Sequence, residues 1–293
     1  MERKWDFEIM TDSSANLPRE IIEGQELSVL SLTYTIDGVE YRGYERGKEV
    51  SAVPVYDMMR NQKEIRTSLV NGQEAEAAAE ELLAEGRDLL YIGLSSGLSG
   101  TYQTVRFTLM ELQEKYPERQ IFAVDSLSAS MGEGLLVQRA VQMREEGCSI
   151  RQTAEWLEAN RIRVCHDFTV EDLFYLRRGG RIGTAAAVLG SALKVKPVLR
   201  MDEEGRLVPA GRARGRKKSL DMLAGQAADA ICHPEKQVVH IIHGDCLADA
   251  EYLSGQIRRS IPVKGIQIRM LEPVLGSHSG PGTVGVMYMG THR

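Results

Sequence analysis

Few cysteines occur in this sequence, and none of them forms a metal-binding or redox pair. The four cysteines lie far apart, without the C-x-x-C spacing of a zinc site or a dithiol: Cys148, Cys165, Cys232 and Cys246. No pair of histidines or cysteines has the spacing of metal ligands. The sequence therefore predicts a reducing compartment, no structural zinc and no other bound metal.

Long apolar runs and a strong net charge are also absent. No apolar run is long enough to cross a bilayer, and residues 1–6 are charged where a signal peptide has its apolar core. The net charge of −5 argues against nucleic acid as the main partner. A chain of 293 residues is long enough for two domains. We therefore expect a two-domain cytoplasmic protein without stable membrane insertion and without a nucleic-acid partner.

The most informative stretch of the chain is residues 89–103. A short apolar run of strand length ends at Ser95, and the small residues that follow lead through Ser99 and Gly100 into a helix. Free N–H groups and hydroxyls at such a strand end, together with the positive end of the helix dipole, favour an anion. No Gly-Lys-Ser/Thr follows, so this is not a Walker loop. The stretch predicts an anion cradle, although serines of this kind are also ordinary turn and cap residues.

Two further segments repeat the pattern of a strand that ends in small polar residues. The predicted strand 7–11 ends at Asp12-Ser13-Ser14, and the predicted strand 121–124 ends at Asp125-Ser126 before a helix. Together with the strand that ends at Ser95, they form a βαβ series. This series predicts a parallel sheet whose functional edge lies at the carboxyl ends of the strands.

We place a domain boundary near residue 163, where the residue pattern changes after the amphipathic helix predicted at 149–160. Residues 1–162 then form an N-terminal α/β domain with the parallel sheet, and residues 163–293 form a C-terminal α/β domain. In the first domain, Asp37-Gly38 before residues 39–41 indicates a hairpin turn. In the second domain, turn residues separate the predicted strands 195–201 and 207–211, which indicates a hairpin and hence a mixed sheet.

Charged and titratable residues in the second domain are further candidates for a site. His278 lies in a predicted loop of Gly, Ser and Pro, where histidines are often functional. Arg177, Arg178 and Arg181 surround two glycines that leave room for an anion to approach. The basic cluster 212–218 is either a solvated helix start or a docking surface for an acidic kinase partner or phosphate.

An alternative interpretation is a serine esterase. Residues 93–97, Gly-Leu-Ser-Ser-Gly, match the G-x-S-x-G nucleophile elbow directly after a strand. The order Ser95, Asp245, His278 is also the order of the triad in α/β-hydrolases. Against an esterase, the sequence has no HGGG-type oxyanion motif, and the loop holds several equivalent hydroxyls. The residues alone leave a ligand cradle and an esterase that uses Ser95 and His278 both open.

Six segments together resemble the DegV family of bacterial fatty-acid-binding proteins. They follow the family's order from the first predicted strand to the last: T-D-S-S-A-N-L at 11–17, R-T-S at 66–68, S-S-G-L-S-G-T-Y at 95–102, V-D-S at 124–126, the stretch 173–182 and H-S-G-P-G at 278–282. The resemblance implies a DegV-like fold of two α/β domains that hold a long-chain fatty acid between them. It also implies that the protein has no catalytic activity and no cofactor, and that a separate fatty acid kinase converts the bound acid to acyl phosphate.

The resemblance further implies which residues hold the ligand. By that comparison the carboxylate of the fatty acid binds to Thr67 and Ser99, with His278 and Arg181 nearby. One motif departs from the family's usual Thr-Ser-x-Pro-Ser, because residues 67–71 are Thr-Ser-Leu-Val-Asn and the proline is missing.

Overall fold

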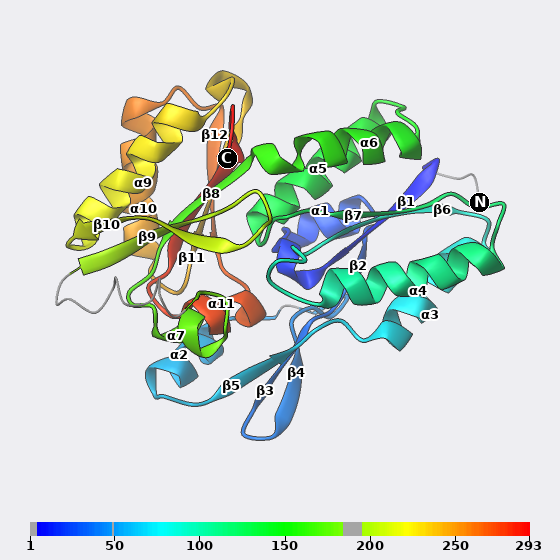
Figure 1. Cartoon of the computed structure of the whole chain (residues 1–293), viewed down its shortest axis with the longest axis horizontal. Helices are drawn as coiled ribbons and strands as arrows, with labels where there is room; N and C mark the ends of the chain where they lie inside the picture. Colours follow the sequence, from blue (N-terminus) through cyan, green and yellow to red (C-terminus); the bar gives the residue numbers. More distant parts are fainter. Residues whose placement is uncertain (1–4, 49, 184–194) are drawn as a thin grey trace.

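Three β-sheets organise the part of the chain that the structure describes, residues 5–48, 50–183 and 195–293 (Figure 1). The structure is a computed structural model. Most of the charged N-terminal segment that bears on the signal-peptide expectation, residues 1–4, lies outside the described residues. No described helix combines the length and apolar character that a membrane span needs.

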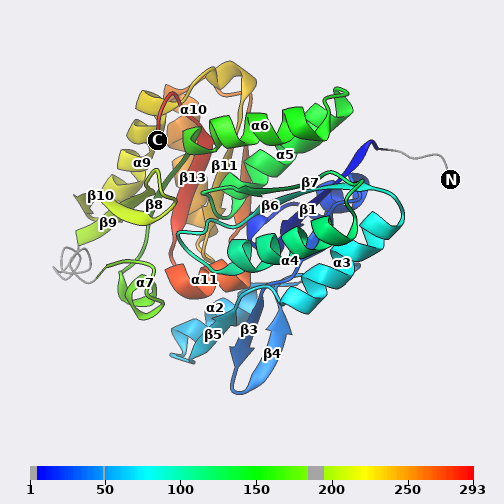
Figure 2. The same cartoon turned by 45° about the vertical axis from the view of Figure 1, so that its right-hand side comes forward.

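The first sheet is parallel, as the sequence predicts. Its strand order is β2 (Ser28–Leu30), β1 (Phe7–Asp12), β6 (Asp88–Gly93) and β7 (Ile121–Asp125). Helices cover both faces (Figure 2): α3 (Gly72–Ala84) and α4 (Thr101–Lys115) on one, α5 (Met131–Glu145) and α6 (Ile150–Asn160) on the other. We call this layered unit the N-terminal lobe.

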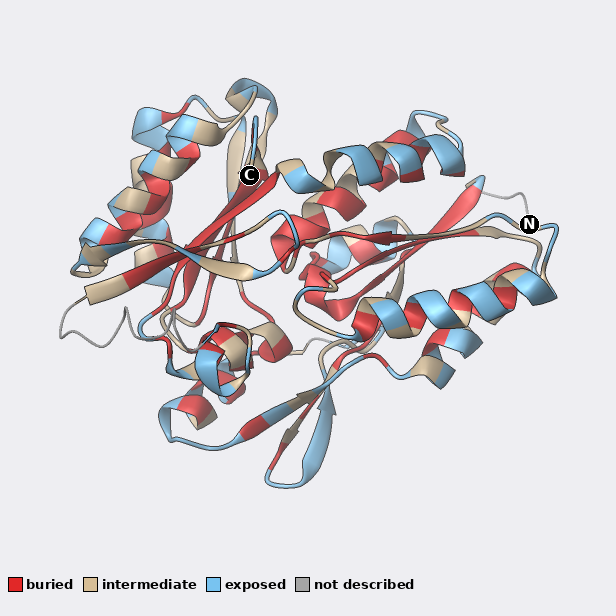
Figure 3. Ribbon diagram, viewed as in Figure 1, coloured by how far each residue is buried: buried red, intermediate tan, exposed pale blue. Residues whose placement is uncertain are grey.

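The apolar run in β6 is explained by these two layers of helices. Leu89 and Tyr91 pack on the α3 and α4 side, whereas Leu90 and Ile92 pack on the α5 and α6 side. Successive side chains of a strand point to opposite faces, so a strand covered on both sides is apolar at every position. Figure 3 shows β1 and most of β6 as buried and the outer helix faces as exposed.

The second sheet is mixed, also as predicted, and forms the C-terminal lobe. Its order is β10 (Leu207–Arg214), β9 (Val195–Met201), β8 (Val164–Thr169), β13 (Val284–Met289), β11 (Val238–His243) and β12 (Gly265–Met270). The β11–β12 pair is parallel and the other described pairs are antiparallel. The helices α9 (Arg216–Ala230) and α10 (Leu247–Ser260) cover one face.

The third sheet is a small antiparallel one that the sequence analysis did not foresee. Its order is β4 (Val39–Arg42), β3 (Thr33–Ile36) and β5 (Ile65–Ser68). The predicted hairpin turn is present between β3 and β4, with φ of 50° at Asp37 and 82° at Gly38. Thr67 therefore lies on a strand and not in a loop ahead of α3. Asn71 caps α3 by accepting from the N–H of Gln73 at 2.9 Å.

Short helices complete the described fold. They are η1 (Ser13–Ala15), α1 (Arg19–Gly24), α2 (Val53–Arg60), η2 (Arg161–Arg163), α7 (Phe174–Arg178), η4 (Pro234–Lys236) and α11 (Pro273–Ser279). The domain boundary predicted near residue 163 falls between α6 and β8, and it stays a prediction.

Helix α5 and a contact between two loops join the lobes. The helix packs on β1 and β6 of the parallel sheet and also on β8, β11 and β13 of the mixed sheet. The hydroxyl of Ser95, in the loop after β6, donates to the carbonyl oxygen of Gly205 in the β9–β10 turn at 2.7 Å. A Cβ on Gly205 would lie 2.1 Å from that hydroxyl oxygen, so glycine is required for this close approach.

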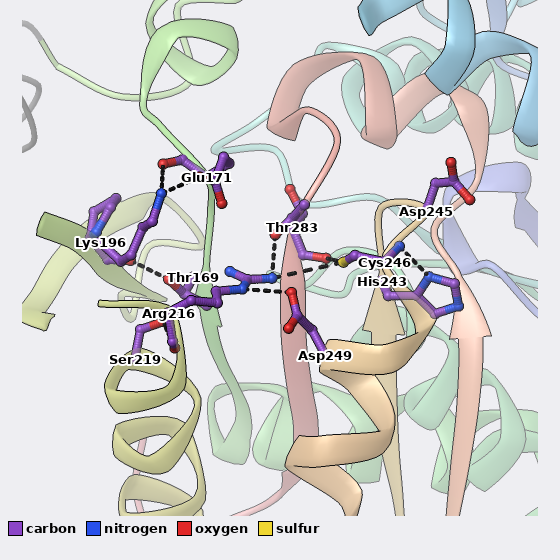
Figure 4. A network of polar contacts seen from close by, with 12 residues as sticks. Thr169, Glu171, Lys196, Arg216, Ser219, His243, Asp245, Cys246, Asp249 and Thr283 are labelled. Carbon is purple, nitrogen blue, oxygen red and sulfur yellow. Dashed lines mark hydrogen bonds and ion pairs between the residues drawn. The ribbon is translucent and has the colours of Figure 1, made fainter. Parts of the chain in front are cut away.

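A polar network fixes the turn that follows α11 (Figure 4). Arg216, at the start of α9, donates to Asp249 at 2.8 Å and to the carbonyl oxygen of Gly282 at 2.6 Å. This residue of the predicted basic cluster is therefore a largely buried structural contact rather than a solvated charge. Arg212, Arg214, Lys217 and Lys218 are exposed.

Candidate ligand-binding site

A pocket with about 240 Å³ of free space lies between the lobes. Its wall is largely apolar and comes from the mixed sheet, the small antiparallel sheet, helices α7 and α11, and the loops that follow strands of the parallel sheet. Apolar side chains that line it include Leu32, Leu94, Leu98, Phe168, Met201, Ile242 and Met287. A cavity of this kind suits a long apolar group, because apolar surface gains free energy when it leaves water.

The four residues predicted to hold a ligand all line this same pocket. Thr67 comes from β5, Ser99 from the loop before α4, Arg181 from the segment after α7, and His278 from α11. The hydroxyl oxygen of Thr67 lies 2.8 Å from Nε2 of His278. Residues more than 200 positions apart in the sequence thus form one polar group beside the apolar wall.

The prediction that His278 lies in a loop is wrong, because this residue lies in the last turn of helix α11. The Glu272 carboxylate caps the helix by accepting from the N–H groups of Val274 and Leu275 at 2.7 and 2.5 Å. Pro273 fits the first position of a helix, and Gly280, with φ of 88°, ends it. Capping by a buried carboxylate outweighs the low helix propensity of Gly276 and the serines.

His278 is neutral at neutral pH. Burial lowers its pKa from 6.5 to about 4, and the charges of Arg181 and Arg178 add to this effect. The end of α7 presses on the ring, since a Cβ on Gly179 would lie 2.4 Å from Nδ1. The imidazole is therefore held in one place, with Nε2 directed to Thr67.

Arg181 places a half-buried positive charge beside this group. Its Nε donates to the carbonyl oxygen of Leu98 at 3.1 Å and its Nη1 to that of Gly179 at 2.5 Å. Within the described residues no carboxylate forms an ion pair with it. Burial lowers the pKa of the guanidinium, but an arginine stays charged at neutral pH. The pocket therefore contains a positive charge that no carboxylate among the described residues neutralises.

Ser99 is oriented by the first turn of α4. Its oxygen accepts from the N–H of Thr101 at 3.2 Å and lies 3.0 Å from the Thr101 hydroxyl. That hydroxyl also accepts from the N–H of Val70 at 3.4 Å. The segment that lacks the family's proline is thus tied to α4 through Val70, and Leu69 in the same segment lines the pocket.

The esterase triad is not assembled. The Ser95 side chain is fully buried and donates to Gly205, whereas Asp245 forms an ion pair with Arg60 at 2.5 Å and His278 contacts Thr67. The elbow serine therefore joins the two lobes instead of facing a general base. In the described ranges, no group of three or more His, Cys, Asp or Glu side chains is arranged to hold a metal ion.

Several pocket residues were not identified from the sequence. Phe168, Met201, Ile242 and Met287 are expected to be buried, but alternation along a strand does not show which face meets a cavity. Ser130 and Ser279 also line the pocket. Ser279 lies inside the segment 278–282 and Ser130 follows the segment 124–126, but nothing in the sequence distinguished either from neighbouring serines.

The fold and this pocket define a class, a two-lobed α/β protein with an internal cavity for a ligand that has an apolar part and a polar part. The family model of the DegV proteins matches residues 6–291. The chain belongs to the DegV family.

Relatives and solved structures of this family match the chain over nearly its whole length. A DegV domain-containing protein of Clostridium perfringens is 41% identical over 284 residues, which is 97% of each chain. A DegV family protein of Thermus thermophilus, described by its fatty acid binding, is 31% identical, with a TM-score of 0.83 over 97% of this chain and 99% of that one. A fatty acid binding DegV family protein of Streptococcus agalactiae is 27% identical, with a TM-score of 0.84 over 97% and 99%.

The buried position of Ser95 makes a prediction about its reactivity. A fluorophosphonate probe reacts with an exposed serine activated by a base, and Ser95 has neither property. We expect no labelling of the folded protein, measured by mass spectrometry of the intact chain after prolonged incubation. Stoichiometric labelling at Ser95 would contradict the assignment of this residue to a structural contact.

Proposed function

We propose that this protein binds a long-chain fatty acid between its two lobes and is not an enzyme. The acyl chain occupies the apolar part of the pocket, and the carboxylate is held by Thr67, Ser99, His278 and Arg181. The observation that carries the proposal is the convergence of these four polar side chains at one apolar cavity.

The head group is held by charge and hydrogen bonds. A carboxylate taken out of water costs several kcal/mol unless donors and a positive charge replace its hydration. Arg181 supplies the charge, and the hydroxyls of Thr67 and Ser99 are donors within the same lining. Neutral His278 donates one hydrogen bond or orients the Thr67 hydroxyl, according to its tautomer.

The tail supplies most of the affinity. Each CH₂ group buried from water contributes about 0.8 kcal/mol, so a chain of ten or more methylenes binds tightly even after the cost of ordering it. The apolar wall provides the surface, and the polar group fixes the register of the chain. Support also comes from the relatives named above, two of which are described as binding fatty acids.

We further propose that the protein presents the bound acid to a separate fatty acid kinase. This step is supported by the DegV resemblance, and the exposed residues Arg212, Arg214, Lys217 and Lys218 offer a surface for an acidic partner. The measurement is acyl phosphate trapped with hydroxylamine after incubation with ATP and a fatty acid kinase of the same cell. We expect product only when both proteins are present. Product from this protein alone, or an equal rate with the kinase and free fatty acid, would exclude a carrier role.

The central test is extraction of the ligand. Protein purified under native conditions and extracted with organic solvent should release free fatty acid, measured by mass spectrometry against a standard. Denaturing purification followed by refolding without lipid is the control and should release none. A native extract without lipid, from protein that also fails to bind added hexadecanoic acid, would refute the proposal.

Two variants test where the carboxylate lies. Thr67→Ala and Ser99→Ala each remove a hydroxyl, and we expect each to weaken fatty acid binding by about 1–3 kcal/mol. Ser96→Ala is the matched control, because it lies in the same loop as Ser99 but does not line the pocket. The measurement is titration calorimetry of delipidated protein, with the unfolding midpoint as a check of the fold. Unchanged affinity in both variants would show that the head group lies elsewhere.

A further inference from the structure

Two buried hydroxyls in the pocket wall have no hydrogen-bond partner in the part of the chain that the structure describes. Ser130 is 3% exposed and Ser279 is 8% exposed, and both line the pocket. Neither Oγ has a partner among the described residues. Buried polar groups in folded proteins are nearly always paired, because an unpaired one loses its hydration without replacement. Two such groups in one cavity indicate that a ligand supplies the missing partner.

One apolar cluster, which includes Ile242, Leu271 and Met287, contains chain neighbours of both serines. Ser130 directly precedes Met131 of this cluster, and Ser279 lies one helical turn after Leu275, which packs against it. Ile242, Leu271, Leu275 and Met287 line the pocket together with the two serines, in the lining proposed to hold the acyl chain.

The backbone of Ser130 is also unusual. Its φ of 52° and ψ of −144° are conformations that residues with a Cβ rarely adopt. Ser130 is the cap residue of α5, yet its hydroxyl makes no capping hydrogen bond. The N–H of Gly132, which a cap side chain can accept from, donates to the carbonyl oxygen of Ala129 instead. The hydroxyl is thus held in the pocket wall by a strained residue and is not used by the helix.

The neighbouring imidazole does not satisfy this hydroxyl. Nδ1 of His166 lies 3.2 Å from the Val164 carbonyl oxygen, and Nε2 accepts from the N–H of Ala129 at 3.5 Å. Burial lowers the pKa of His166 to about 3, so the ring is neutral. Both nitrogens face backbone groups.

We propose that the pocket selects a long-chain fatty acid that carries a hydroxyl on its chain, bound by Ser130 and Ser279. This inference rests on the proposed function and names its ligand class. A chain hydroxyl both donates and accepts, so it pairs with a serine that has no other partner. A site built to hydrogen-bond a ligand hydroxyl discriminates against the ligand that lacks it.

The test compares octadecanoic acid with a series of octadecanoic acids in which one hydroxyl is moved along the chain. Affinities for delipidated protein are measured by competition with a fluorescent fatty acid. We expect at least one hydroxylated acid to bind about 10-fold more tightly than octadecanoic acid. If octadecanoic acid itself does not bind, the proposed function fails. If it binds and every hydroxylated acid binds equally or more weakly, only this inference is overturned, as when a trapped water pairs with the serines.

Variants identify the groups responsible. Ser130→Ala and Ser279→Ala should each reduce the preference for the best hydroxylated acid several-fold while octadecanoic acid still binds. Ser130→Gly removes the same hydroxyl and tolerates the positive φ, so it replaces Ser130→Ala if that variant does not fold. Ser277→Ala is the control, because its buried hydroxyl already donates to Val274 at 2.7 Å and does not line the pocket. A preference that survives the loss of both pocket hydroxyls would refute their role.

Discussion

The arrangement of the pocket depends on the contact between the half-buried guanidinium of Arg181 and the carbonyl oxygen of Leu98. The guanidinium ties the C-terminal lobe to the Leu98 carbonyl of the N-terminal lobe, and its charge lies in the pocket wall without a carboxylate partner in the described part of the chain. A charge in a low-dielectric site is costly unless it is paired. The two lobes therefore meet around a positive charge that a carboxylate ligand would compensate. The apolar wall beside this charge fits the acyl chain of the proposed ligand.

Motifs that look catalytic in the sequence have structural roles here. The G-x-S-x-G serine holds the β9–β10 turn against the loop after β6, and the buried Asp12 carboxylate orders the same region by accepting from the N–H of Leu94 at 3.0 Å and the Tyr91 hydroxyl at 3.1 Å. Arg216, from a basic cluster, holds the turn after α11. In each case a polar side chain replaces the hydration of backbone groups where loops of two elements meet. The pocket keeps its shape because these loops are fixed.

Local sequence patterns predicted the regular parts of the fold. The apolar strands and polar strand ends gave the parallel sheet, and Asp37-Gly38 gave a hairpin turn. The strand that carries Thr67 and the helix that carries His278 were missed for one physical reason. A short strand such as β5 is stabilised by pairing with β3, and α11 is capped by buried Glu272, so neither depends mainly on its own residues.

The sequence by itself determined the α/β class and the parallel sheet. Through its resemblance to the DegV family it also predicted Thr67, Ser99, Arg181 and His278 as candidate ligand-binding residues. Tertiary structure alone decided that these four share one cavity, that Ser95 is buried against Gly205, and that Ser130 and Ser279 line the pocket without partners among the residues described. Periodicity in a sequence records which residues are buried. It does not record what faces them, because that depends on how two sheets and the loops between them pack together.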